Sequence, residues 1–114
     1  MKGKLTDKIR IQHILDAILE TEAYLKSVSF ESFLDNSEKR FATIKQIEIV
    51  GEAGKHSAKE VKRQQPEIMW TQINGFRNIS IHEYFGVSLQ LVWDIAKNDL
   101  PSLKEKFNEI LKGL

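Results

Sequence analysis

The stretch that decides the fold runs from residue 44 to residue 61 and reads IKQIEIVGEAGKHSAKEV. Small and apolar residues recur in it at alternating steps of three and four, which is the spacing of one face of an α-helix. They are Ile44, Ile47, Gly51, Gly54, Ala58 and Val61. We predict a helix over about residues 38–63, capped by Asn36 or Ser37. Each glycine costs about 1 kcal/mol relative to alanine in a helix, so we expect another backbone to pass close to Gly51 and Gly54.

Amphipathic patterns occupy most of the remaining chain. Residues 5–28 carry apolar side chains at threes and fours without proline or glycine, which predicts a long helix. Shorter helices are predicted from about Pro66, over residues 88–97 and over the last dozen residues. Their inward positions, in chain order, are Ile11, Ile14, Leu15, Ile18, Leu25, Val28, Trp70, Ile73, Leu91, Val92, Ile95, Leu103, Phe107, Ile110 and Leu111. The fold class is therefore all-α, an antiparallel bundle of four or five helices.

We also predict the roles of two residues outside these apolar stripes. Asp99 precedes Pro101 by two positions, and we predict that it caps the last helix, with the proline in the first turn. His13 lies near the charged side of its helix, and we expect it to be solvated rather than to bind a ligand.

Length and composition limit the classes of function. The 114 residues, 41% hydrophobic, fit a single domain over residues 1–114. The net charge of +1, with 29% charged residues, excludes a strongly basic polymer-binding protein, so any RNA site must be local. The absence of cysteine excludes disulfides and thiolate metal sites. No apolar run approaches membrane-spanning length, and we expect a soluble cytoplasmic protein.

The segment from Gly75 to Gly86 is the richest in chemistry, because it holds Arg77, Asn78, His82 and Tyr84. Arginine suits a phosphate, and histidine transfers protons near neutral pH. On a helix, Arg77 and His82 lie about 140° apart around the axis. They therefore converge only through the length of the arginine or through a second copy. On residue types alone, a helix that makes ordinary surface pairs ranks ahead of a catalytic one.

This segment resembles the R-x4-H-x-Y motif of HepT-like toxins, members of the HEPN superfamily of helical ribonucleases. Other blocks occur in that family's order: Gly51-Glu52-Ala53, Pro66-Glu67-Ile68, Tyr84-Phe85-Gly86-Val87 and Asp99-Leu100-Pro101. The resemblance covers nearly the whole chain. It implies a metal-independent endoribonuclease without a cofactor, in which Arg77 contacts the phosphate and His82 transfers protons. Asn78 would then orient His82 from one turn away.

The resemblance also implies partners and supporting residues. The protein would be the toxin of a toxin–antitoxin pair, acting as a homodimer with two motifs at one cleft. Its antitoxin would be a nucleotidyltransferase of the MntA type that adenylylates Tyr84. Glu52 would support the arginine of the motif across a helix interface.

Other interpretations remain open at this point. One is a non-catalytic helical module that binds a nucleotide or a partner protein, and another is a plain dimerisation subunit. Glu48, Glu52 and His56 also have a spacing that fits a metal site, but no second carboxylate–histidine pair accompanies them. A polar stripe paired with neighbouring lysines explains them better, and we predict no metal.

Overall fold

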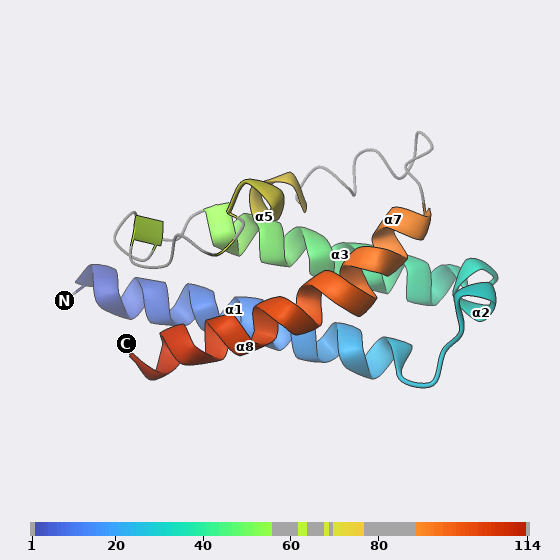
Figure 1. Ribbon diagram of the computed structural model, residues 1–114, viewed down its shortest axis with the longest axis horizontal. Helices are drawn as coiled ribbons and strands as arrows, with labels where there is room; N and C mark the ends of the chain where they lie inside the picture. The colour runs from blue at the N-terminus through green and yellow to red at the C-terminus, as the bar shows by residue number, and fades with distance from the viewer. Residues whose placement is uncertain (1, 56–61, 64–67, 69, 77–88, 114) are drawn as a thin grey trace.

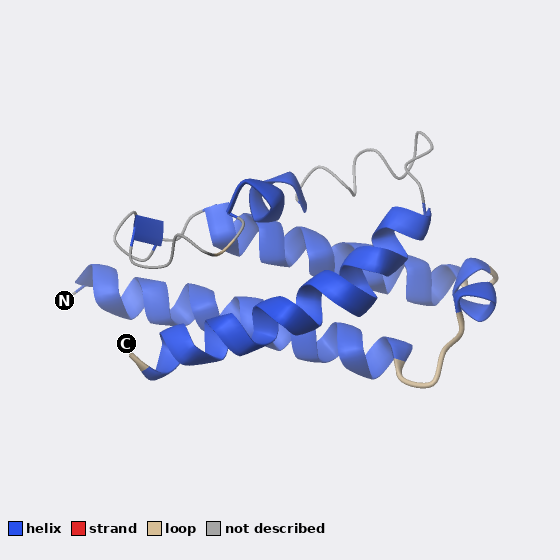
Figure 2. Cartoon of the chain, viewed as in Figure 1, coloured by secondary structure: helices blue, strands red, loops and turns tan. Residues whose placement is uncertain are grey.

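The computed structural model describes residues 2–55, 62–63, 68, 70–76 and 89–113, and the elements in these ranges are helical (Figures 1 and 2). In chain order they are α1 (Lys2–Leu25), α2 (Phe30–Leu34), α3 (Ser37–Lys55), α5 (Trp70–Phe76), α7 (Leu89–Asp94), the π-helical turn η1 (Ile95–Asp99) and α8 (Leu100–Lys112). No strand occurs in the described ranges. The prediction of an all-α fold is confirmed.

Three long helices form the body of the molecule. Helix α1 runs in one direction, and α3 and α8 return beside it in the other, as Figure 1 shows. Polar contacts join them: Gln46 Nε2 donates to the Tyr24 hydroxyl at 3.0 Å, and Lys104 Nζ lies 2.9 Å from Glu22 Oε1. The apolar stripes face inward together, so that Ile14, Ile18, Ile47 and Phe107 are fully buried. Burial of these stripes is the main force that holds the helices together.

Local signals set the turns between α1 and α3. Ser29 Oγ accepts a hydrogen bond from the Ser32 amide and caps the short helix α2. Asn36 Oδ1 accepts from the Lys39 amide at 3.0 Å, which confirms the predicted cap of α3.

Helix α8 begins at Leu100, directly after Asp99, but the prediction that the Asp99 side chain caps it is wrong. The chain passes from α7 through η1 into α8, and Asp99 has helical dihedral angles (φ −73°, ψ −46°) with no side-chain capping hydrogen bond. Pro101 does fall in the first turn of α8, as expected. The predicted inward position of Leu91 is also wrong, because this side chain is 49% exposed whereas its neighbour Val92 is buried.

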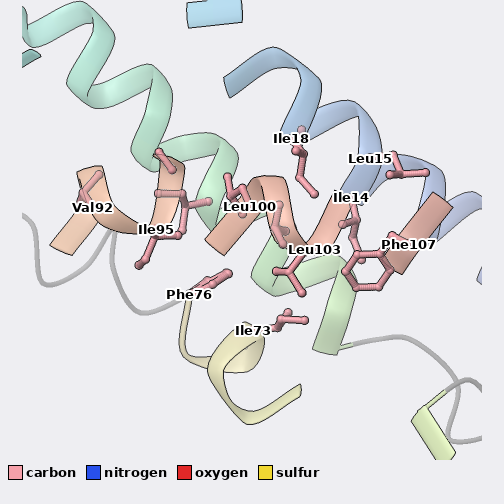
Figure 3. Close-up of a cluster of buried hydrophobic side chains, with 14 of the residues drawn as sticks. Ile14, Leu15, Ile18, Ile73, Phe76, Val92, Ile95, Leu100, Leu103 and Phe107 are labelled. Carbon is pink, nitrogen blue, oxygen red and sulfur yellow. The ribbon is translucent and has the colours of Figure 1, made fainter. Parts of the chain in front are cut away.

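The short helix α5 packs on α3. Gly54 is buried in α3, and a Cβ atom at this position would overlap Ile73 Cγ2. A side chain of α5, rather than its backbone, therefore occupies the space that the glycine leaves. Figure 3 shows Ile73 and Phe76 extending from α5 into the cluster that holds Leu100, Leu103 and Phe107.

Two expected features of the α3 region lie outside the described residues. They are the inward positions Ala58 and Val61 and the start of a helix at Pro66. In the described ranges, no helix has both the length and the apolar character needed to cross a membrane.

Candidate functional site

The four motif residues, Arg77, Asn78, His82 and Tyr84, lie outside the described residues. What the structure describes is the helix that leads into them. Phe76 is the last described residue of α5 and immediately precedes Arg77, and its side chain is only 2% exposed. The point at which the motif begins is therefore anchored in the core.

Apolar contacts hold α5 from two sides. Ile73 is fully buried against Gly54 of α3. Trp70, half-buried, meets the ring of Phe107 in α8 edge-on at a centroid distance of 5.8 Å. This contact agrees with the predicted inward position of Trp70. Lys62 Nζ also lies over the indole, 5.7 Å from its centroid.

A polar contact joins α5 to η1. Gln72 Nε2 donates to Asp99 Oδ2 at 3.0 Å. Partial burial raises the pKa of the Asp99 carboxyl, and the negative charge of Asp94 raises it further. The carboxylate that was predicted to cap α8 is thus directed toward α5 instead.

Glu52 lies on another side of α3, where the groove between α1 and α3 opens. This α1–α3 groove has a volume of about 390 Å³, and Glu52 shares it with Arg10 and His13 of α1 and with Lys45 and Glu48 of α3. Lys45 Nζ is 3.5 Å from Glu48 Oε1. His13 is exposed at the groove wall, in agreement with its predicted solvation. The lining charges have both signs, so the groove does not have the uniformly positive surface that a phosphate backbone favours.

The structure brings together few of the predicted site residues. Glu52 faces the groove, whereas α5 packs on α3 at Gly54, so the two features occupy different sides of that helix. His56, the third member of the weighed metal spacing, lies outside the described residues. Among the residues that are described, no three His, Asp or Glu side chains gather closely enough to hold a metal ion.

An all-helical bundle, with α5 anchored in the core directly before the R-x4-H-x-Y sequence, agrees with the fold that the family resemblance implies. Comparison with known proteins identifies the family: the family model "Ribonuclease HepT-like" matches residues 14–110, and the chain belongs to this family. The match includes every motif residue.

Individual relatives agree with this assignment. The chain is 38% identical over 109 residues to "Probable ribonuclease HepT" of Thermococcus cleftensis, covering 96% of this chain and 99% of that protein. It is 35% identical over 91 residues to a "Putative RNase" of Methanocaldococcus jannaschii, covering 80% and 78% of the two chains. A "Putative RNase" of Caldanaerobacter subterraneus is 33% identical over 107 residues, covering 94% and 96%. No solved structure matches. These names support RNase activity and an RNA substrate for the family.

Sequence reasoning missed the pairing of Gln72 with Asp99. No local sequence pattern predicts this contact, because the two residues are 27 positions apart. The only signal was the Asp99-Leu100-Pro101 block, and its aspartate was interpreted as a helix cap.

Proposed function

We propose that this protein is a metal-independent endoribonuclease, the toxin of a toxin–antitoxin pair, that acts in the cytoplasm as a homodimer. The family match over residues 14–110, with Arg77, Asn78, His82 and Tyr84 all present within it, carries the proposal. The burial of Phe76 supports it, because a catalytic arginine benefits from a fixed starting point.

In the proposed reaction a ribose 2′-hydroxyl loses its proton and its oxygen attacks the adjacent phosphorus. The bond to the 5′-oxygen breaks, and that oxygen leaves with a proton, so the products are a 2′,3′-cyclic phosphate and a 5′-hydroxyl. His82 transfers the protons, and Asn78 orients its ring. Arg77 neutralises the charge that builds on the phosphoryl oxygens. Two motifs at a dimer cleft would surround one phosphate. Glu52 is proposed as a supporting residue, and its groove-facing position is the starting point for testing that role.

The catalytic roles predict that Arg77→Ala and His82→Ala each abolish RNA cleavage, because removing one charge-stabilising or proton-transferring group typically costs a factor of about 10² to 10⁴. Cleavage by the parent protein should persist in EDTA and leave a cyclic phosphate, measured on a short labelled RNA by gel and mass spectrometry. His13→Ala, a groove histidine outside the motif, is the matched control and should retain activity. Full activity in His82→Ala, or cleavage that requires an added divalent metal, would contradict the mechanism.

We further propose that a nucleotidyltransferase antitoxin of the MntA type silences the toxin by adenylylating Tyr84. The added AMP places a negative phosphate close to Arg77 in the sequence, where it would compete with substrate phosphate and repel the RNA backbone.

Co-expression with the nucleotidyltransferase should therefore add AMP mass units to the protein, and the additions should disappear in Tyr84→Phe. Intact-mass spectrometry measures both. Tyr24→Phe removes the other tyrosine, whose hydroxyl accepts from Gln46, and should leave modification unchanged. AMP found on a residue other than Tyr84 refutes this step without affecting the ribonuclease proposal.

A further inference from the structure

The contact between Gln72 and Asp99 links the helix that precedes the motif to the π-helical turn before α8. Gln72 Nε2 donates to Asp99 Oδ2 at 3.0 Å, and the two residues are 27 positions apart. Asp99 is the last residue of η1, a five-residue turn. Wider π-helical turns inside α-helices occur frequently at functional sites.

The hydrogen bond between Gln72 and Asp99 helps to fix the rotation of α5 about its own axis. The described stretch of α5 packs on α3 and, through Trp70, on Phe107 of α8, so these neighbouring elements fix its orientation. Ile73 and Phe76 fix its apolar side in the core. Gln72 is exposed, and its hydrogen bond fixes a different side of the helix. Arg77 directly follows Phe76 in the sequence, so the orientation of α5 determines where the motif begins.

A carboxylate at position 99 stabilises the folded protein less than a neutral side chain of the same shape would. Partial burial and the charge of Asp94 disfavour its ionised form. An asparagine would offer the same acceptor oxygen without that penalty. What the carboxylate adds is a charge-assisted hydrogen bond, which is stronger and more directional than a neutral one. A residue that lowers stability while it strengthens one contact is typical of a functional role.

We propose that Asp99 is a positioning residue that acts through Gln72 to set the orientation of α5 and, with it, of the motif that begins at Arg77. This inference rests on the proposed ribonuclease function for its catalytic consequence. The contact itself exists independently of that function.

Exchange of the amide and the carboxylate between positions 72 and 99 tests the inference. Gln72→Glu places two carboxylates against each other and should lower kcat by about tenfold or more, with little change in KM, because misorientation of about 1 Å costs up to a hundredfold. The double variant Gln72→Glu with Asp99→Asn restores an amide–carboxylate bond in the opposite direction and should recover most of kcat. Asp99→Asn alone should lower kcat while raising the melting temperature at neutral pH. A purely structural residue would move both quantities in the same direction.

The chain contains a matched control. Gln90 Nε2 donates to Asp94 Oδ1 at 2.9 Å, and this pair lies wholly within α7. Gln90→Glu makes the same change in charge opposite an aspartate without touching α5, and it should leave kcat unchanged. Gln72→Met removes the donor without adding charge, and it replaces Gln72→Glu if the latter does not fold.

A readout that does not depend on catalysis separates the two proposals. Hydrogen–deuterium exchange of the backbone amides of residues 77–82 should become faster in Gln72→Glu and return to the parent rate in the double variant. If the parent protein cleaves no RNA, the proposed function fails, and exchange alone decides whether the positioning contact exists. If the parent cleaves RNA and Gln72→Glu retains full kcat, or if the double variant recovers neither kcat nor exchange, the positioning role is wrong.

Discussion

At the scale of single residues, the contact between Gly54 and Ile73 shows most directly how individual side chains hold α5 on α3. The missing side chain at position 54 creates the space that Ile73 Cγ2 fills. Ile73 is fully buried and β-branched, so it has few alternative rotamers with which to avoid an added atom. This contact is therefore rigid, and Phe76 lies within one helical turn of it.

Gly54→Ala should destabilise the protein by about 1–3 kcal/mol, because overpacking of a filled core outweighs the gain of about 1 kcal/mol in helix propensity. The measurement is urea unfolding followed by circular dichroism. Gly75→Ala is the matched control, since no described residue lies within 4 Å of a Cβ at that position, and it should stabilise the protein slightly.

A double-mutant cycle with Ile73→Ala assigns the effect to the contact. The cost of Gly54→Ala should fall when alanine occupies position 73, because Cγ2 is then absent. Equal costs of Gly54→Ala in both backgrounds would show that Ile73 is not the neighbour that the glycine accommodates.

At the scale of elements, the π-helical turn η1 is the feature that gives Asp99 its environment. A capping aspartate lies outside the helix with its carboxylate toward free amides, whereas Asp99 lies within a continuous helix, near Asp94 and partly buried. The raised pKa of its carboxyl follows from this environment.

This raised pKa has a consequence for stability as a function of pH. In the window between the usual aspartate value of 3.8 and the raised value, the folded protein binds more protons than the unfolded chain. The contribution of Asp99 to stability is therefore unfavourable above the window and is relieved as pH falls through it. Asp99→Asn should melt at a higher temperature than the parent at pH 7, and the difference should shrink at pH 3–4. A parent protein that is the more stable of the two at pH 7 would contradict this expectation.

The sequence predicted well the helices whose apolar residues are regularly spaced, but it did not predict the connections between helices. The stripes of α1, α3 and α8 follow from side chains three and four residues apart, and Ile47 or Phe107 lies where the spacing places it. The turn at Asp99 depends on packing against α5 and α1, which a local cap signal does not contain. Leu91 fails for a related reason: Leu91 and Val92 lie four and three residues before Ile95, so both positions fit the helical spacing and the spacing alone does not decide which of them faces inward.

At the scale of the whole molecule, the bundle places its elements so that α5 has α3 on one side and the η1–α8 segment on another. The candidate site could be predicted only as residues in a motif, because resemblance supplied their roles. Its geometry depends on contacts distant in sequence, such as Gln72 with Asp99 and Trp70 with Phe107.

If residues 77–82 are helical, as the sequence predicts, Arg77 and His82 of one chain are separated by about 140° around the axis and do not converge on one substrate by themselves. We therefore predict a two-fold dimer at micromolar concentration, measured by sedimentation velocity. Mixing inactive Arg77→Ala and inactive His82→Ala should restore part of the cleavage, because hybrid dimers carry one intact arginine and one intact histidine at a shared cleft. A strictly monomeric protein that cleaves RNA, or a dimer in which mixing restores nothing, would argue against the composite cleft.

The aromatic packing at the two ends of the bundle provides a built-in optical assay. The chain has two tryptophans: Trp70 rests on Phe107 beside α5, and Trp93 rests on Phe30 and Phe33 at the α2–α7 end, under Lys97. Each is half-buried, so its fluorescence emission reports on its own end of the molecule. In Trp93→Phe the remaining emission follows α5 alone. Detachment of α5 from the bundle then becomes visible as a red shift, in real time and without a label.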